Sequence, residues 1–259
     1  MAEVPARERH KTFQDGWSSL MPVAVVTGAG QGLGRADCLR LAEDGFDVMC
    51  LDLNIDAARE TAELCGGTAF QLDVTDRAAV FAVADQIPEC FALVNNAGIW
   101  NFPSILDVTE QQMQSVIEVN VKGIVWCCQA FVPKMRAGGG GSIVNMSSGA
   151  AWTNSPEIGI YPATKAAVES LSKTLALELG VDNIRSNAIG PGLIVSDGTA
   201  GNFEGARANE RAQGVPMKRV GAPADIADVV SFLCSNDSRY VSGQVIYVDG
   251  AITAGAMKR

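Results

Sequence analysis

Tyr161 and Lys165 have the side-chain types and the spacing that acid–base chemistry needs. Residues four apart on a helix share one face, and the stretch beginning at Tyr161 has a helical pattern. An ammonium group beside a phenol favours the phenolate and lowers the phenol pKa from its ordinary value near ~10. We therefore expect Tyr161 to act as an acid or base near neutral pH, with Lys165 tuning it. Taken alone, the pair is better interpreted as a surface tyrosine beside a solvated lysine. The serine and the glycine-rich stretch described below make the catalytic interpretation the better one.

Ser148 lies 13 residues before Tyr161, directly after a predicted strand. Its hydroxyl and the phenol can converge on one substrate oxygen and stabilise the charge that develops there as an alcohol becomes a ketone. Ser147 is the alternative, although its place in the strand alternation suits a strand terminus better.

A glycine-rich stretch, Thr27–Gly34, follows a short apolar run and opens a helical pattern. Glycines there let the backbone approach a pyrophosphate, and the start of the helix supplies positive potential. The spacing of Gly28, Gly32 and Gly34 matches neither G-x-G-x-x-G nor a P-loop. The placement between strand and helix nevertheless favours nucleotide binding over a turn without a ligand.

Asp52 ends the second predicted strand, 18 residues after Gly34. A carboxylate there can bind both ribose hydroxyls of an adenosine and would repel a 2′-phosphate. Gln31, Leu53 and Asn54 offer no cation to hold such a phosphate. We expect NAD(H) rather than NADP(H), the alternative being that Asp52 is an ordinary strand-end turn residue.

Composition excludes several other functions. The net charge of −9 argues against nucleic acid and anionic membranes as partners. His10 is the only histidine, which excludes a Ser-His-Asp triad and a histidine-ligated metal in the core. No metal site is expected, and the hydride chemistry would come from the cofactor.

The seven cysteines are odd in number and contain no C-x-x-C pair, so we expect reduced core thiols in a cytoplasmic protein. Residues 1–20 are polar and lack the apolar segment of a signal peptide, and we interpret them as a flexible extension. No apolar run is expected to reach the length that spans a bilayer.

Short apolar runs alternate with amphipathic helical stretches along residues 21–259. The predicted strands are 22–26, 46–51, 68–72, 91–94, 142–146, 184–189 and 244–248. Helical patterns cover 33–43, a stretch from about 55, 77–86, 109–135, 161–179 and 223–234. This alternation predicts one α/β domain, a doubly wound Rossmann-type parallel sheet of about seven strands with helices on both faces.

Together these segments resemble the short-chain dehydrogenase/reductase family, in its classical subfamily of about this length. The resemblance extends from Pro22 to about Val248. Each motif alone is weak evidence for the family, whereas the order and spacing of all the motifs together are highly specific for it. The motifs are Thr27–Gly34, Asp73-Val74, Asn95-Asn-Ala-Gly98, Asn120, Ser148, Tyr161-x-x-x-Lys165 and Pro191-Gly192. The family's usual aspartate before the Leu93-Val-Asn-Asn96 strand is missing, with Phe91-Ala92 in its place.

The resemblance implies roles for individual residues. The catalytic set would be Asn120, Ser148, Tyr161 and Lys165, with the Asn120 backbone carbonyl holding a water that links Lys165 to solvent. Lys165 would also hold the nicotinamide ribose. The remaining cofactor-binding residues implied are Gly28, Gly32, Leu33, Gly34, Asp52, Asp73, Val74, Asn95, Ala97, Gly98, Pro191, Gly192, Ile194 and Ser196, the serine standing where the family usually has threonine.

The substrate side is less determined by the sequence. We expect a pocket formed by Trp100, Ala150, Trp152, Leu193 and Phe203, with a lid of loop and short helix at about 197–216. The two tryptophans favour an apolar, cyclic or aromatic substrate as much as they favour packing against the lid or the core.

The favoured activity is an NAD-dependent secondary-alcohol dehydrogenase that works as a ketone reductase in reverse. One alternative is a 3-ketoacyl-thioester reductase of the same family, and another is a non-catalytic, nucleotide-sensing protein. The resemblance also implies a homotetramer or dimer paired through the helices at about 109–135 and 161–179.

Overall fold

A computed structural model gives the structure of the chain and describes residues 21–255, except 101–102, 155, 157 and 198–204. The predicted extension at 1–20, which contains His10, therefore lies outside the described residues, as does Phe203 of the expected substrate pocket. The first part of the predicted lid, at 198–204, is also outside them.

The described residues form a seven-stranded sheet in the order β3-β2-β1-β4-β5-β6-β7, and every pair in it is parallel. The strands are β1 (Val23–Thr27), β2 (Asp47–Asp52), β3 (Thr68–Gln71), β4 (Ala92–Asn95), β5 (Gly141–Met146), β6 (Ile184–Pro191) and β7 (Val245–Val248). The doubly wound parallel sheet predicted from the sequence is confirmed, and strand boundaries differ from the expected ones by at most two residues.

The helices of this domain are α1 (Gly32–Glu43), α2 (Ile55–Cys65), α3 (Arg77–Gln86), α4 (Glu110–Ile117), α5 (Gly123–Ala137), α6 (Ala150–Thr153), α7 (Tyr161–Leu179), α8 (Gly205–Gly214) and α9 (Pro223–Cys234). Local chemistry fixes several of their starts. Asn54 and Asp76 cap α2 and α3 by accepting backbone N–H bonds, and Pro223 stands at the first position of α9, where its missing donor costs nothing.

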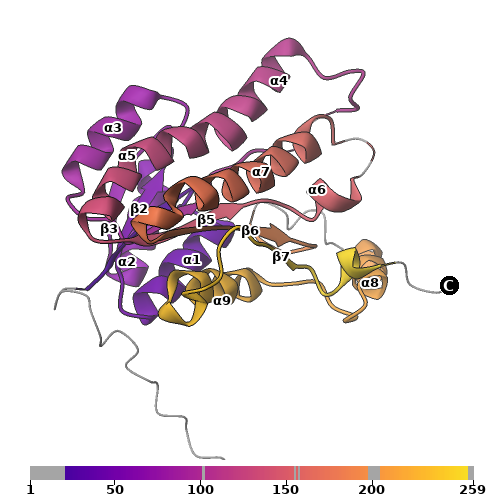
Figure 1. Cartoon of the computed structure of the whole chain (residues 1–259). Coiled ribbons are helices and arrows are strands. Elements are labelled where there is room, and N and C mark those ends of the chain that lie inside the picture. Colours follow the sequence, from indigo (N-terminus) through magenta and orange to yellow (C-terminus); the bar gives the residue numbers. More distant parts are fainter. Residues whose placement is uncertain (1–20, 101–102, 155, 157, 198–204, 256–259) are drawn as a thin grey trace, which may run out of the picture.

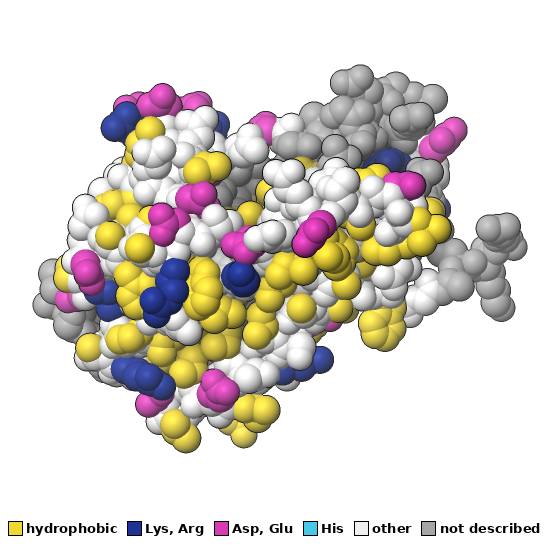
Figure 2. Space-filling view, turned by 90° about the horizontal axis from the view of Figure 1, so that it is seen from above, with side chains coloured by type: hydrophobic (Ala, Val, Ile, Leu, Met, Phe, Trp, Pro, Cys, Tyr) yellow, Lys and Arg dark blue, Asp and Glu magenta, His cyan; other side chains and the backbone are white. Residues whose placement is uncertain are grey.

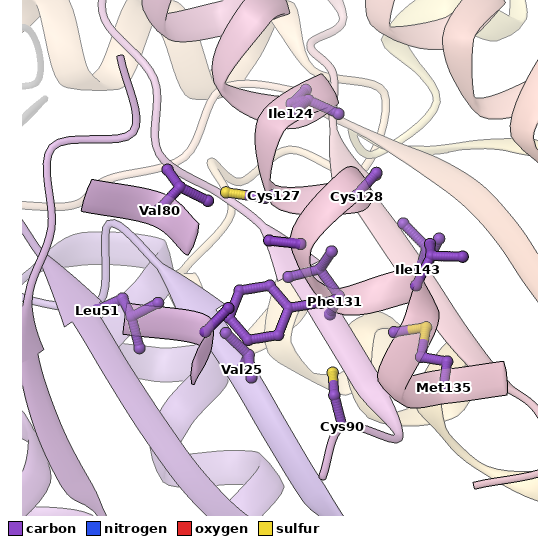
Figure 3. Packing of buried hydrophobic residues seen from close by; sticks show 14 of the residues in the cluster. Val25, Leu51, Val80, Cys90, Ile124, Cys127, Cys128, Phe131, Met135 and Ile143 are labelled. Atoms are coloured by element: carbon purple, nitrogen blue, oxygen red, sulfur yellow. The ribbon is translucent and has the colours of Figure 1, made fainter. Parts of the chain in front are cut away.

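The helices cover both faces of the sheet, as Figure 1 shows. On one face α3, α5 and α7 pack over a core centred on Phe131, which lies among Val25, Val80 and Ile143 (Figure 3). On the other face α1, α2 and α9 enclose a second core that includes Leu41 and Ile226. Strands β1, β2 and β4 between them are largely buried, which is why they appear in the sequence as nearly continuous apolar runs, whereas the edge strands β3 and β7 are only partly buried.

The strand order reverses between β1 and β4, so the chain leaves these neighbouring strands toward opposite faces. In open α/β sheets the crevice beyond the carboxyl ends of the strands at this point is the usual ligand site. The Gly-rich stretch follows β1, Asp52 ends β2, and Ser148 follows β5. The topology therefore brings the sequence-predicted residues to one edge of the sheet.

The predicted long helix at 109–135 is continuous but not uniform. Between α4 and α5 the residues Glu118–Lys122 form a π-helical turn, η1. By length and composition alone, the run Glu110–Ala137 could cross a membrane, so the expectation that no stretch reaches that length was wrong. Half of its apolar window is buried inside the domain, where α5 packs as a core helix against α3 and the sheet.

Candidate active site

The loop after β1 is shaped by backbone contacts that exclude side chains. A Cβ on Gly34 would lie 2.1 Å from the Gly28 carbonyl oxygen, and one on Gly28 would lie 2.9 Å from the Ala97 Cα. Gly28 and Gly32 also have positive φ angles of 65° and 57°. These positions need glycine because the loop packs against the turn after β4 and exposes its main chain to the crevice.

Asp52 connects the end of β2 to this loop. Its Oδ2 accepts the Gly30 N–H at 2.8 Å, and its Oδ1 accepts the Asn54 N–H at 2.9 Å. A carboxylate offers about four acceptor positions, so lone pairs remain for two hydroxyl donors. The neighbouring Leu53 side chain is 64% exposed. The nearby Arg35 guanidinium is held by the Gly30 carbonyl at 2.7 Å and by Glu60.

A cavity of about 510 Å³ runs along the carboxyl ends of the strands, from Asp52 and Asp73 at one end to Ser148 and Tyr161 at the other. That volume is typical of a site for a cofactor or a drug-sized molecule. Predicted cofactor residues that line it are Gly28, Gly32, Leu33, Asp52, Asp73, Val74, Ala97, Gly98, Tyr161, Lys165, Pro191, Gly192, Ile194 and Ser196.

Ser148 and Tyr161 both line the inner end of this cavity, and the Ser148 hydroxyl lies close enough to the phenol to favour the phenolate. The Ala150 N–H donates to Ser148 Oγ at 3.1 Å, which orients the serine side chain. Ser147 points elsewhere: its buried hydroxyl donates to Glu169 on α7 at 2.9 Å. The structure thus separates the two serines, placing Ser148 beside the phenol and Ser147 against the helix.

Lys165 is 4% exposed, and its Nζ donates to the Met146 carbonyl at 2.7 Å. The ammonium lies 5.7 Å from the centroid of the Tyr161 ring. Burial lowers the pKa of Lys165 to about 8. An ammonium carries three donors, so donors remain for a ligand in the adjoining cavity.

The pKa of Tyr161 departs from the expected direction. Burial raises this pKa above its ordinary value, and the hydrogen bond with Ser148 acts the other way as the smaller effect. The Lys165 Nζ donates to the Met146 carbonyl at the end of β5 and lies 5.7 Å from the centroid of the Tyr161 ring, and it is not among the causes that lower the Tyr161 pKa. The sequence-based expectation of a lowered pKa is therefore wrong for the protein without a ligand.

Asn120 lies in the π-helical turn η1 and is fully buried. Its side-chain amide accepts the Ile99 N–H at 2.9 Å and donates to the Ile99 carbonyl at 3.0 Å. It also donates to Thr164 Oγ1 at 3.2 Å, one residue before Lys165. The amide is thus used to join η1, α7 and the turn after β4, so the predicted water would have to bind the backbone carbonyl instead. π-turns are frequent at functional sites.

The segment after β6 closes one side of the cavity. The Gly192 N–H donates to the Val248 carbonyl at 3.0 Å, and Ile194 pairs with Gly221. The Asp197 carboxylate accepts the Gly32 N–H at 3.3 Å, which joins this segment to the glycine loop. Pro191, Gly192, Ile194 and Ser196 are thereby held along one wall.

Several predicted residues lie away from the cavity lining. Asn95 is buried and donates to Asn145 at 2.8 Å, and Gly34 is packed beneath the loop. Among the expected substrate residues, Trp100 lines the cavity. Trp152 packs against Tyr247 with ring centroids 6.4 Å apart, and Leu193 lines a smaller cavity of about 200 Å³.

Two residues that organise the loop were not among the predicted site residues. The Asn96 side chain donates to the carbonyls of Thr27 and Gly28 at 3.1 and 3.0 Å. The Thr27 hydroxyl oxygen accepts the Asn96 and Ala97 N–H groups, each at 3.1 Å. The sequence signal that could have identified them is their position, since Thr27 begins the glycine stretch and Asn96 lies inside the Asn-Asn-Ala-Gly motif.

Comparison with known proteins agrees with this geometry. A family profile described as Enoyl-(Acyl carrier protein) reductase matches residues 28–253. The chain is 37% identical over 243 residues to an uncharacterized short-chain type dehydrogenase/reductase, y4mP, of Sinorhizobium fredii, a match covering 88% of this chain and 96% of that protein. It is 36% identical over 242 residues to the 3-oxoacyl-[acyl-carrier-protein] reductase FabG of Staphylococcus aureus, covering 88% of this chain and 97% of that one.

A solved structure from Beutenbergia cavernae, described as a candidate NAD(P)-dependent gluconate 5-dehydrogenase with NADP bound at low occupancy, has a TM-score of 0.85 and 32% identity. The alignment covers 92% of this chain and 99% of that chain. The chain belongs to the short-chain dehydrogenase/reductase family. It is an oxidoreductase of this family, whose members use a nicotinamide cofactor.

The residues present fit such a cofactor. The glycine loop has no room for a Cβ at Gly34, Asp52 keeps acceptors for ribose hydroxyls, and Lys165 keeps buried donors at the opposite end. The cavity joins these three places without interruption.

Proposed function

We propose that this protein is an NAD(H)-dependent dehydrogenase that interconverts a secondary alcohol and a ketone. The observation that carries this proposal is the convergence of Ser148, Tyr161 and buried Lys165 on one cavity that also reaches Asp52, with the Lys165 ammonium 5.7 Å from the centroid of the Tyr161 ring. Ser148 and Tyr161 present two hydroxyl groups to one substrate oxygen, which is the arrangement that a carbinol or carbonyl oxygen requires.

In the oxidation direction, Tyr161 first gives up its own proton to solvent, and the resulting phenolate oxygen takes the proton of the substrate hydroxyl. The Ser148 hydroxyl donates a hydrogen bond to the same substrate oxygen as charge develops on it. Lys165 holds positive charge near the phenol and directs donors into the cavity, and the Asn120 carbonyl is proposed to hold the water that returns protons to solvent. The nicotinamide, when bound, accepts the hydride from the carbinol carbon. In reduction, Tyr161 donates the proton.

We assign NAD(H) as the preferred cofactor because Asp52 would repel a 2′-phosphate, whereas Leu53 supplies no charge and Arg35 is already paired with Glu60. The NADP held by the Beutenbergia cavernae protein means that family membership does not decide this preference. The test is kcat/KM with each cofactor, for the wild type and for Asp52→Ala combined with Leu53→Arg. The wild type should prefer NAD(H), and the double variant should move toward NADP(H); equal wild-type efficiency with NADP(H) would contradict the assignment.

The substrate is proposed to be apolar, and cyclic or aromatic, because Trp100 lines the cavity near the catalytic residues and is 45% exposed there. The test is a panel of secondary alcohols with NAD⁺, following the absorbance of the reduced cofactor. No turnover with any alcohol or ketone would favour the nucleotide-sensing alternative.

A 3-ketoacyl-thioester reductase is the second candidate, and the 36% identity to the Staphylococcus aureus reductase favours it. The net charge of −9 disfavours docking to an acidic carrier protein. Acetoacetyl-CoA assayed beside the alcohol panel, with NADH and NADPH in parallel, separates the two candidates. Higher kcat/KM for the thioester would replace our first assignment.

The protein is further proposed to form a homotetramer or dimer through α5 and α7. Apolar side chains gather on the face of the molecule that carries α4, α5 and α7 (Figure 2). Among the exposed apolar side chains of these helices are Leu177 on α7, which is 84% exposed, and Met113 on α4, which is 38% exposed. Light scattering after size-exclusion chromatography should give a molar mass that is a multiple of the 27.2 kDa chain mass. The Leu177→Glu variant should give a lower molar mass than the wild type.

The seven cysteines are free thiols, which supports a reducing compartment such as the cytoplasm.

A further inference from the structure

One carboxylate connects the catalytic helix to two strands of the sheet. Glu169 lies on α7, one helical turn after Lys165, and is half-buried. Its Oε1 accepts a hydrogen bond from Ser147 Oγ at 2.9 Å and a second from the Tyr247 hydroxyl at 2.8 Å. Ser147 follows β5 and Tyr247 lies on β7, so a single oxygen joins three elements. Bonds to an ionised acceptor are stronger than bonds between neutral groups.

The first connection reaches the catalytic residues. Ser147 stands between Met146, whose carbonyl holds Lys165 Nζ, and Ser148, whose hydroxyl meets the phenol. Its N–H is fixed to the Ile189 carbonyl at 2.7 Å, and its Oγ also lies 3.2 Å from the Lys165 carbonyl. A bond from Ser147 to Glu169 therefore docks the end of β5 onto the turn of α7 that carries Lys165.

The second connection reaches the wall proposed for the nicotinamide. Tyr247 on β7 pairs in register with Gly190 on β6. A Cβ on Gly190 would lie 2.4 Å from the Tyr247 ring, so the ring packs directly against the backbone of this part of β6. The next residue, Val248, accepts the Gly192 N–H. Burial raises the pKa of Tyr247 to about 12, and Glu169 and Asp249 act in the same direction, so the phenol stays a donor.

We propose that Glu169 is a positioning residue, which holds Ser148 and Lys165 in place through Ser147 and holds the Pro191-Gly192 segment through Tyr247. The inference rests on the proposed function, since it concerns the same site. It predicts two separable effects, one on the chemical step through β5 and one on cofactor affinity through β7.

A matched control is available one turn further along the same helix. The Ser172 hydroxyl is also buried, accepts from Asn145 at 2.9 Å and donates to the Val168 carbonyl at 2.8 Å. It joins α7 to β5 much as Glu169 does, but away from the cavity lining. Ser172→Ala should lower stability to denaturant without a specific change in kcat or cofactor affinity.

The experiment compares Glu169→Ala, Glu169→Gln, Ser147→Ala and Tyr247→Phe with Ser172→Ala. The measurements are kcat and KM with the best alcohol of the panel, Kd for NADH by fluorescence titration, and urea unfolding. We expect Glu169→Ala to lower kcat about tenfold and weaken NADH binding several-fold, as slight misplacement of reacting groups does. Glu169→Gln should recover most of both, because its amide oxygen still accepts two hydroxyl donors.

The two single-contact variants should divide the effect. Ser147→Ala should lower kcat a few-fold with unchanged NADH affinity, whereas Tyr247→Phe should weaken NADH binding with little change in kcat. The inference is overturned if Glu169→Ala matches Ser172→Ala in kcat and Kd at equal stability. It is also overturned if Glu169→Gln is as impaired as Glu169→Ala, because charge rather than the two hydrogen bonds would then be responsible.

The readouts separate this inference from the proposed function. If the wild type turns over no substrate of the panel, the proposed function fails, and NADH titration still tests the contact through Tyr247. If the wild type is active but Glu169→Ala keeps wild-type kcat and Kd, only the positioning role fails.

Discussion

The two ends of the cavity hold a ligand by different physical means. At the end proposed for the adenosine, the groups that line the crevice belong to the glycine loop, together with half-buried Asp52 and exposed Asp73. At the catalytic end the groups are the side chains of Ser148, Tyr161 and Lys165, and burial shifts the pKa of both the tyrosine and the lysine. The first end depends on shape and the second on side-chain chemistry, so substitutions at each should fail in different measurements.

The largest effect is expected from Tyr161→Phe. The variant loses the proton donor and acceptor but keeps the ring, so turnover should fall by about 10²–10⁴-fold while NADH still binds. Steady-state kcat and fluorescence titration of NADH check the two halves of this expectation. Tyr240→Phe is the control, since Tyr240 is fully exposed. Retention of more than about a tenth of wild-type kcat would remove Tyr161 from the catalytic role.

Replacement of the two adjacent serines should give unequal effects. Ser148→Ala removes the hydroxyl that meets the phenol and should lower kcat by about 10²-fold, as loss of one donor to a developing oxyanion does. Ser147→Ala should cost only a few-fold, because that hydroxyl contacts Glu169 rather than the cavity. Parallel kcat measurements decide, and equal losses would mean that the structure assigns the serines incorrectly.

At the adenosine end, Gly34→Ala should act on binding rather than chemistry. The new Cβ would lie 2.1 Å from the Gly28 carbonyl, so the loop must shift and NADH affinity should fall by more than about tenfold. Isothermal titration of NADH measures this change. Gly180→Ala is the matched control, because a Cβ there meets nothing within 4 Å. Unchanged affinity in a folded Gly34→Ala protein would show that the loop tolerates the shift.

The smallest effect should appear in the pH dependence of stability. Burial lowers the pKa of Lys165 from 10.5 to about 8, so between these values the unfolded chain binds more protons than the folded one. The stability contribution of Lys165 therefore rises with pH in that window, by up to about 1.4 kcal/mol per pH unit. The measurement is the free energy of unfolding in urea at several pH values, wild type minus Lys165→Met. A difference that stays flat from pH 8 to 10.5 would contradict a buried, easily deprotonated lysine.

Sequence patterns predicted the sheet well because the largely buried strands β1, β2 and β4 are apolar and because strand and helix patterns alternate along the chain. Helices α3, α7 and α9 begin and end at the residues that their helical patterns predicted. The π-helical turn at Asn120 was not predicted, since the apolar periodicity continues through it. The first two positions of the Asn-Asn-Ala-Gly motif were also not distinguished: Asn95 donates to Asn145, while Asn96 donates to the backbone of the glycine loop.

The order and spacing of the motifs were enough to determine the sheet, the position of the cavity and the identity of the serine, tyrosine and lysine that meet there, because each of these follows from local pattern and topology. Only the tertiary structure decided how these groups are charged and connected. The Met146 carbonyl, from another strand, takes the Lys165 ammonium, and burial raises the Tyr161 pKa instead of lowering it. Tyr247, 78 residues from Glu169, completes the contact that joins α7 to β7. Burial and long-range hydrogen bonds depend on which distant segments pack together, and that is set by the whole fold rather than by any motif.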